Sequence, residues 1–278
     1  VLDCEPVVKE GTIGLDAEIL DENGEPVILE TGTVEFKDVT FSYPDSSGEV
    51  VLSNINLKIN KGEKIGILGS TGCGKSTLVK LIARFYDTTS GSVYIDGIDV
   101  KDYKFSALRN KVAVVLQKSE LFSGTIKDNI CWGKEDATME EVEYAAKIAQ
   151  ADTFINGFVD KYDTYVAEKG ASLSGGQKQR ISIARALIKK PEILVFDDST
   201  SALDLQTEAK LYQAINNDLK DLTIITIAQR VASVKNANKI IVFNDGTITD
   251  IGTHEELIKN SPTYIDIYNS QLKKAGDE

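Results

Sequence analysis

A glycine-rich stretch of this chain has the residue types and the spacing of a phosphate-binding loop. It fits the pattern G-x-x-x-x-G-K-[ST] and consists of Gly69, Ser70, Thr71, Gly72, Cys73, Gly74, Lys75, Ser76 and Thr77. Because glycine has no Cβ, consecutive backbone N–H groups can converge on phosphate oxygens, and the following helix adds its unpaired N–H groups. In this pattern Lys75 bridges the outer phosphates and the hydroxyl of Ser76 ligates Mg²⁺.

The stretches on either side of the loop are those that the motif requires. The apolar residues 64–68 predict a buried strand that leads into the loop, and residues 76–85 predict a helix that leads out of it. Strand, glycine loop and helix together are the structural context of a phosphate-binding loop. The sequence therefore predicts an α/β domain that binds a phosphorylated ligand.

A second apolar run, residues 193–196, predicts a buried strand that ends in Asp197 and Asp198. In open α/β sheets ligands bind at the carboxyl ends of the strands, so a carboxylate at this position is expected to face the phosphate site. This arrangement matches a Walker B strand, and Asp197 is the predicted metal ligand. Two further predicted strands, residues 112–116 and 223–227, are followed by Gln117 and Gln229, respectively.

Composition excludes several other classes of protein. The chain has 278 residues, 43 acidic against 31 basic side chains and a net charge of −12, which disfavours nucleic acid as a partner. No apolar run approaches the roughly 20 residues needed to cross a bilayer. The three cysteines are widely spaced, so neither a disulfide framework nor a zinc site is expected, and a reducing compartment fits best.

The charge and periodicity patterns divide the chain into regions. Residues 1–32 are predicted to be an acidic linker or arm, and because the first residue is not methionine we expect an excised piece of a longer protein. Residues 33–60 alternate in the manner of antiparallel strands, and residues of about 124–190 show a helical pattern. The sole histidine, His254, heads a predicted C-terminal helix and is expected to be a capping or solvent-facing residue.

A further motif gives the sequence a family resemblance. It consists of Leu173, Ser174, Gly175, Gly176 and Gln177. Together with the phosphate loop and the Walker B strand, it resembles the signature of the nucleotide-binding domain of exporter-type ATP-binding cassette (ABC) transporters. The resemblance covers residues 33 to about 272. It implies an α/β fold with a P-loop NTPase core of mainly parallel sheet, an N-terminal antiparallel β subdomain and an inserted α-helical subdomain, within a domain at residues 33–278.

The resemblance also implies roles for single residues. Tyr43, which on pattern alone would be an ordinary strand-end tyrosine, resembles the tyrosine that stacks on adenine. Gln117 resembles the glutamine that touches Mg²⁺ and senses the membrane domain, and Asp204 belongs to a segment that resembles the D-loop. Residues 121–126 and 168–170 resemble the segments that contact the coupling helices of transmembrane domains. The implied cofactors are ATP and Mg²⁺.

In the resembling family two cassettes pair head to tail, and each ATP lies between the phosphate loop of one and the signature of the other. Ser174 supplies a hydroxyl there, and Gly175 and Gly176 expose N–H groups at the start of a helix. The implied partners are therefore a second nucleotide-binding domain and transmembrane domains. The implied location is the cytoplasmic side of the cell membrane.

Two positions depart from the family pattern, and both concern hydrolysis. Asp198 stands where the family usually has a glutamate that activates water, and its carboxylate is shorter by about 1.5 Å, one C–C bond. Gln229 stands where the family usually has a histidine that contacts the γ-phosphate, and glutamine cannot carry a proton's charge. A base must lie within hydrogen-bond reach of the proton it takes.

With an intact signature, these departures resemble the degenerate half of a heterodimeric ABC exporter, which binds ATP and hydrolyses it poorly. One alternative is a homodimeric exporter in which Asp198 works as the base. Another is a soluble, non-transport ABC ATPase or a nucleotide-gated binding module. The catalytic residues predicted under these readings are Asp198, Gln229 and Gln117, and the predicted metal ligands are Ser76, Gln117 and Asp197.

Overall fold

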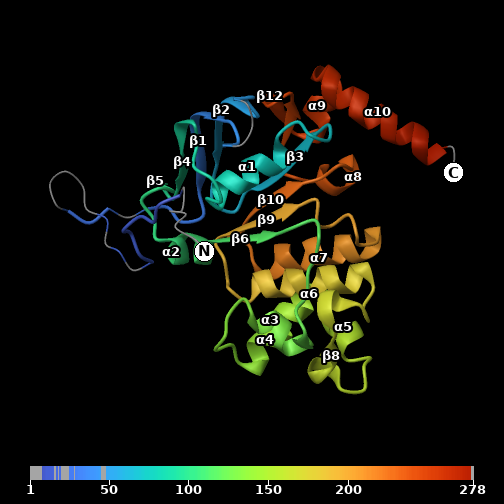
Figure 1. Cartoon of the computed structure of the whole chain (residues 1–278). Helices are drawn as coiled ribbons and strands as arrows, with labels where there is room; N and C mark the ends of the chain where they lie inside the picture. The colour runs from blue at the N-terminus through green and yellow to red at the C-terminus, as the bar shows by residue number, and fades with distance from the viewer. Residues whose placement is uncertain are drawn as a thin grey trace.

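The computed structural model describes residues 8–15, 17, 19, 25–27, 29–44 and 48–276. Its central sheet has the strand order β12-β11-β3-β10-β9-β6 (Figure 1). The five strands from β11 to β6 are parallel to their neighbours, and β12 pairs antiparallel with β11 as a hairpin. The strands span β3 (Lys64–Gly69), β6 (Val112–Val115), β9 (Ile193–Asp197), β10 (Thr223–Ile227), β11 (Lys239–Asn244) and β12 (Thr247–Gly252).

A second, antiparallel sheet has the order β2-β1-β4-β5. Its strands are β1 (Val34–Phe41), β2 (Leu52–Ile59), β4 (Ser90–Ile95) and β5 (Ile98–Asp99). The helix α1 (Lys75–Ile82) packs its apolar side chains into one core with both sheets, and α2 (Phe105–Lys111) joins the same core. Because β1 and β2 alternate between buried and exposed positions, one face of this sheet covers that core.

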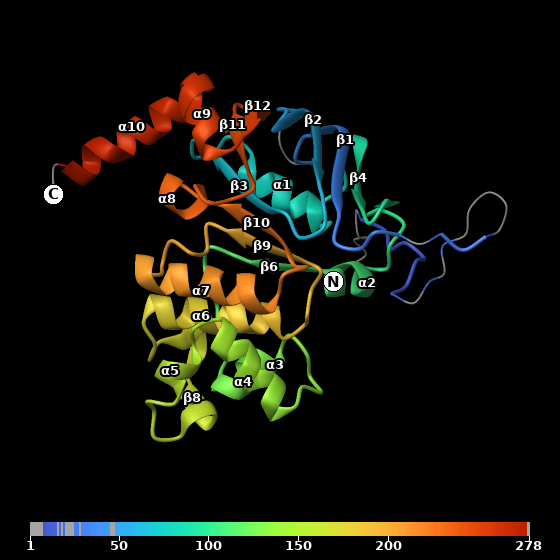
Figure 2. The same ribbon diagram turned by 180° about the vertical axis from the view of Figure 1, so that it is seen from behind.

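The other face of the central sheet is covered by helices, seen below β6, β9 and β10 in Figures 1 and 2. Buried side chains of α6 and α7 form a second core with Leu194, Phe196 and Ile224 of the sheet. The elements of this layer are α3 (Ile126–Cys131), α4 (Met139–Ile148), α5 (Asp152–Ile155), α6 (Gly175–Leu187) and α7 (Leu205–Asp218). A short β7 (Gly124–Thr125) pairs with β8 (Tyr165–Val166), beside two 3₁₀ turns at Lys161–Asp163 and Glu168–Gly170.

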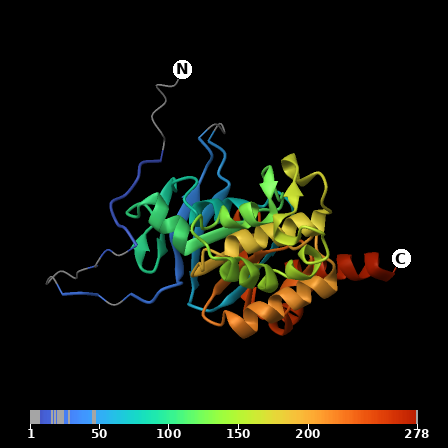
Figure 3. The same cartoon turned by 90° about the horizontal axis from the view of Figure 1, so that it is seen from below.

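Three C-terminal helices complete the fold: α8 (Val231–Val234), α9 (His254–Asn260) and α10 (Pro262–Gly276). They form a third core with β3 and β11, and the far end of α10 projects from the domain (Figure 3). Within the part of the chain that is described, no helix has the length and apolar character needed to cross a membrane.

The predicted three-part architecture is confirmed, with one difference in helix length. The helix after the glycine loop ends at Ile82 instead of Phe85. Arg84 adopts a left-handed φ of 49°, and the N–H of Phe85 bonds back to the carbonyl of Lys80 at 2.8 Å, which closes the helix. The predicted domain boundaries stay predictions.

The acidic N-terminal region makes contacts of its own in the part that is described. The N–H groups of Gly11 and Thr12 bond to the carbonyls of Tyr103 and Asp102 at 3.1 and 2.9 Å, respectively. A Cβ on Gly11 would lie 2.3 Å from the backbone of Asp102, so this close approach needs glycine.

An ion cluster around the buried carboxylate of Asp96 ties the two sheets together. Lys111, at the end of α2, donates at 2.9 Å to Asp96 of the β4–β5 turn and at 2.9 Å to Glu192 before β9. Burial opposes the charge of Lys111, but the hydrogen bonds to the two carboxylates outweigh it and raise its pKa. Asp96 also accepts the N–H of Thr33, so its carboxylate is held by two elements.

We predict that Lys111→Met destabilises the domain by about 3 kcal/mol, because it leaves the carboxylate of Asp96 buried without its counter-charge. Urea unfolding measures this loss. Lys37→Met is the matched control, since Lys37 is 53% exposed and pairs with Glu35 at the surface, and it should change stability by less than about 0.5 kcal/mol. Equal effects of the two substitutions would show that the cluster contributes nothing special.

Candidate functional site

The glycine loop lies between β3 and α1, and its glycines are required by backbone geometry. Gly72 and Gly74 have φ values of 86° and 104°, which side-chain-bearing residues rarely adopt. A Cβ on Gly74 would lie 2.7 Å from Leu52, and a Cβ on Gly69 would lie 2.3 Å from the carbonyl oxygen of Phe243. The loop is therefore pressed against β2 and β11 while its N–H groups at the start of α1 remain available to an anion.

Lys75 is folded into this loop. Its side chain is buried, and Nζ donates to the carbonyl oxygens of Gly69 at 2.9 Å and Ser70 at 2.6 Å. The sulfur of Cys73 lies 3.6 Å from the same ammonium. A positive charge is thus held where a phosphate resting on the loop would sit.

Ser76 and Asp197 meet across the site. The hydroxyl of Ser76, in the first turn of α1, donates to Oδ1 of Asp197 at 2.8 Å. A hydroxyl and a carboxylate from two rigid elements are the oxygen ligands that Mg²⁺ prefers, and bound phosphates complete such sites. These two residues fit the predicted metal role, whereas Gln117 makes a different contact.

The carboxylate of Asp198 joins the ends of three neighbouring strands. Its Oδ2 accepts from Nε2 of Gln117, which follows β6, at 2.9 Å. The same oxygen accepts from Nε2 of Gln229, which follows β10, at 2.7 Å. The two residues that depart from the family pattern are therefore in direct contact.

The position of Asp198 is also strained and enclosed. Its φ is 50°, its side chain is buried, and its N–H bonds to the carbonyl of Ile227 at 2.9 Å. Burial is the main cause that raises the pKa of Asp198, and the charge of Asp197 adds to the rise, against the hydrogen bond from Gln229 and the charges of Lys75 and Arg230. The carboxyl accordingly keeps its proton to a higher pH than an exposed aspartate.

Tyr43 lies beside the loop helix. Its hydroxyl and that of Thr77 are 2.9 Å apart, and Nζ of Lys80 donates to it at 3.2 Å. The ring makes edge contacts with Phe41 and Tyr86, with centroids at 4.9 and 5.2 Å. The structure thus brings Tyr43 to the site at the N-terminal end of α1.

The signature and D-loop residues lie at the starts of other helices. Ser174 caps α6 by accepting the N–H of Gln177 at 3.3 Å, and Gln177 accepts the N–H of Ser174 in return. Asp204 caps α7 through Thr207. Among the described contacts no hydrogen bond or ion pair joins these caps to the phosphate loop. Ser201 connects the D-loop to the site by donating to the carbonyl of Asp198 at 2.7 Å.

A surface groove of about 640 Å³ runs between the sheet and the helical layer, and sequence reasoning did not identify it. Phe122 and Trp132, 42% and 62% exposed, stack on its wall with ring centroids 4.0 Å apart. Phe85 and Leu116 add further exposed apolar surface. The isolated sequence positions of these residues carry no periodic signal that would have grouped them.

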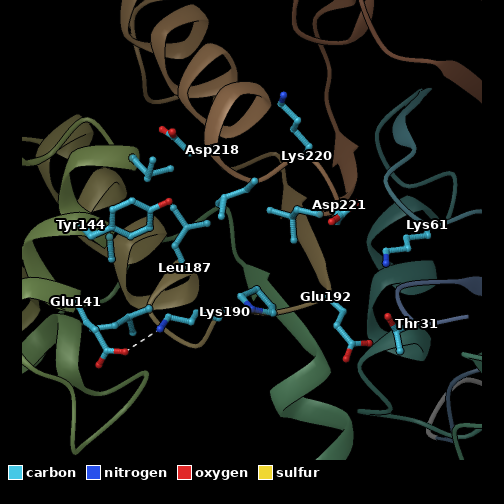
Figure 4. A pocket seen from close by; sticks show the side chains of 16 residues that line it. Thr31, Lys61, Glu141, Tyr144, Leu187, Lys190, Glu192, Asp218, Lys220 and Asp221 are labelled. Atoms are coloured by element: carbon cyan, nitrogen blue, oxygen red, sulfur yellow. Dashed lines mark hydrogen bonds and ion pairs between the residues drawn. The ribbon is translucent and has the colours of Figure 1, made fainter.

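Another cavity, of about 450 Å³, lies near the starts of β9 and β10, at the end of these strands away from the glycine loop (Figure 4). Residues of α4 and of the C-terminal ends of α6 and α7 line it. Glu141, Glu192, Asp218 and Asp221 line it, and Glu141 is paired with Lys190. Its lining residues include no glycine. Lys61, Lys190 and Lys220 line it too, so it has no excess of positive charge, and without a glycine loop it offers no cradle of backbone N–H groups for phosphate. The glycine loop therefore remains the candidate site.

A glycine loop between strand β3 and helix α1, with a carboxylate at the end of β9 on the far side of β10, defines a P-loop nucleotide-binding domain. The family profile of ABC transporters matches residues 52–201, more than half of the 278 residues, so this chain belongs to the ABC transporter family.

Similar proteins agree with this assignment. YgaD of Bacillus subtilis, provisionally named a multidrug export ATP-binding/permease protein, is 48% identical over 240 residues, which cover 86% of this chain and 41% of YgaD. YfiB of the same bacterium, an uncharacterized ABC transporter ATP-binding protein, is 47% identical over 260 residues, which cover 93% and 45% of the two chains. The chain thus spans less than half the length of these relatives.

A solved structure of a bacterial Atm1-family ABC exporter with ATP bound superposes with a TM-score of 0.84 at 35% identity. The match covers 91% of this chain and 44% of the exporter chain. The predicted fold class is therefore the fold of an ABC exporter's cassette.

We predict that Asp198→Asn raises the thermal midpoint of the ligand-free domain at pH 7. Because the folded pKa of Asp198 lies above the unfolded one, its contribution to stability falls as pH rises through that interval. Asparagine removes the buried charge, and its carbonyl oxygen can still accept from both glutamines. The difference from the parent should shrink as pH falls toward about 4.

Thermal scans between acidic and neutral pH measure this effect. Asp160→Asn, which changes an exposed carboxylate, is the control and should shift the midpoint little at any pH. Equal midpoints of the parent and Asp198→Asn at pH 7 would contradict the prediction.

Proposed function

We propose that this chain is the ATP-binding cassette of an exporter and that it binds ATP with Mg²⁺ at the glycine loop. The observation that carries the proposal is the arrangement of Lys75 inside the loop, with Ser76 and Asp197 meeting 2.8 Å apart beside it. ATP would lie with its phosphates on the loop and its adenine against Tyr43. Mg²⁺ would be held by Ser76 and Asp197 and would neutralise charge on the phosphates.

We propose further that two cassettes associate head to tail. The supporting observation is that Ser174, Gly175 and Gly176 form an uncovered helix start that makes no described contact with the chain's own phosphate loop. A Cβ placed on Gly175 would meet nothing within 4 Å, and the residue is exposed, so the start of α6 is open to solvent there. The first N–H groups of a helix have no acceptor within it and can bind an incoming phosphate. The signature of this chain would complete the site of its partner cassette.

The site's own hydrolysis is proposed to be weak. The carboxylate oxygen of Asp198 already accepts from two amides, and its side chain is one methylene shorter than glutamate. Gln229 can donate a hydrogen bond to a phosphate but cannot share a positive charge with it. The chain would thus hold ATP, while its partner's site performs most of the hydrolysis, as in the degenerate half of a heterodimer.

The apolar groove beside Phe122 and Trp132 is proposed to receive a coupling helix of a transmembrane domain. Exposed aromatic rings at a concave surface are typical of a docking site. The name of YgaD includes a permease part, and this chain spans less than half of that protein. Coupling through this groove would place the domain on the cytoplasmic side of the membrane.

We predict that Lys75→Ala weakens Mg-ATP binding by at least about tenfold, because one charge-assisted hydrogen bond to phosphate contributes about 1.5–3 kcal/mol. Titration calorimetry measures the dissociation constants. Lys101→Ala removes a lysine outside the site and is the control. Unchanged ATP affinity in Lys75→Ala would overturn the assignment of the site.

We predict that the double variant Asp198→Glu, Gln229→His hydrolyses Mg-ATP up to roughly a hundredfold faster than the parent, since a base misplaced by about 1 Å can cost that much. Steady-state phosphate release at high domain concentration gives both rates. The control pair Asp160→Glu, Gln213→His makes the same chemical changes at exposed positions and should leave the rate unchanged.

A parent that already turns over as fast as the double variant would show that Asp198 suffices as the base. In that case the homodimeric exporter would replace the degenerate half as the best interpretation.

A further inference from the structure

One side chain of the C-terminal helix holds the backbone on both sides of Arg230. Nε2 of Gln271, in α10, donates to the carbonyl oxygen of Gln229 at 2.7 Å. Oε1 of the same amide accepts the N–H of Val231 at 2.9 Å. The two bonds form a bridge from α10 to the loop that carries Gln229.

The N–H of Val231 needs such a partner. Val231 is the first residue of α8, and the first N–H groups of a helix have no acceptor within the helix. Because Val231 is buried, water does not replace the missing acceptor. Gln271 therefore satisfies a polar group that the local sequence leaves without a partner.

The helix that presents Gln271 is itself fixed to the domain. Tyr264, in its first turns, is fully buried, and its hydroxyl lies 2.6 Å from Nδ1 of His254. Ile267 and Tyr268 pack with Val231 and Val234 in the third core. These contacts fix α10 as far as Tyr268, and Gln271 lies three residues further along the same helix.

The loop in turn sets the side chain of Gln229. Nε2 of Gln229 lies 2.7 Å from Oδ2 of Asp198, a distance that a small backbone shift would break. The C-terminal helix is therefore linked through Gln271 and Gln229 to the carboxylate of the Walker B segment.

We propose that Gln271 is a positioning residue that holds Gln229 where it meets the terminal phosphate of ATP. This rests on the proposed function, in which Gln229 faces that phosphate. Gln271 touches neither nucleotide nor metal. It acts on the backbone of the residue that does, so its loss affects binding of a triphosphate and leaves binding of a diphosphate nearly unchanged.

The first experiment needs no nucleotide. In Gln271→Met, which keeps the side-chain length and removes both hydrogen bonds, hydrogen exchange of the Val231 amide should speed up by about threefold to tenfold. Gln271→Glu keeps an acceptor for that amide and should retain most of its protection. Asn269→Leu removes an exposed amide of the same helix and should leave exchange of Val231 unchanged.

The second experiment compares the affinities of adenylyl imidodiphosphate and ADP, each with Mg²⁺, by calorimetry. Gln271→Met should weaken the triphosphate analogue about threefold to tenfold and change ADP by less than about twofold. Gln271→Glu loses the donor to the Gln229 carbonyl and should also weaken the triphosphate analogue more than it weakens ADP. The test therefore stands even where the methionine variant folds poorly.

Two outcomes would overturn the inference. Unchanged exchange at Val231 in Gln271→Met would show that the bridge does not hold the loop, and an equal loss for ADP and the analogue would show a general structural role. Failure of the parent to bind either nucleotide would reject the proposed function instead, and the exchange result would still decide whether Gln271 holds the loop.

Discussion

The site depends on one oxygen atom, Oδ2 of Asp198, which accepts from both Gln117 and Gln229. The sheet order β10-β9-β6 makes this possible, because neighbouring parallel strands end at the same edge and deliver the three residues together. A slip of one residue in any of these strands would turn its end away from the carboxylate. The register of the central sheet is therefore a functional constraint as well as a structural one.

The same contact bears on how the two unusual residues are interpreted. Asp198 and Gln229 depart from the family pattern separately in the sequence, yet in the fold they form one hydrogen bond of 2.7 Å. The amide of glutamine is neutral and donates a hydrogen bond to the carboxylate, but it cannot take up or release a proton. Histidine and glutamate would instead form a pair that can transfer a proton. We therefore interpret the two changes as one physical change, in keeping with the proposal that this site holds ATP and hydrolyses it poorly.

Elements away from the phosphate loop hold this arrangement in place. The cluster of Lys111, Asp96 and Glu192 ties the antiparallel sheet to the start of β9, and the third core anchors α10 beside the loop after β10. In both places a buried polar group receives its partner, the carboxylate of Asp96 from Lys111 and the N–H of Val231 from Gln271. The far end of α10 projects beyond the domain (Figure 3), and the helix contributes to the site through its packed residues and Gln271.

The sequence by itself determined the phosphate loop, the Walker B strand and the fold class. These features are local. A glycine-rich loop and an apolar run of strand length can each be recognised from a few consecutive residues of the sequence. The resemblance to the ABC family likewise rested on short motifs: the phosphate loop, the Walker B strand and the signature at residues 173–177. The role of Tyr43 at the adenine stays a prediction, because it concerns a bound nucleotide. The roles of Ser174 and Asp204 stay predictions, because they concern a second cassette.

Only the tertiary structure decided which of these residues meet. The contacts of Asp198 with Gln117 and Gln229, the stack of Phe122 on Trp132 and the bridge from Gln271 to the loop after β10 all join distant segments. No periodicity links such positions, because their proximity follows from strand order and helix packing. The physical reason is that a hydrogen bond requires placement within about 3 Å, which a folded core provides and a motif does not.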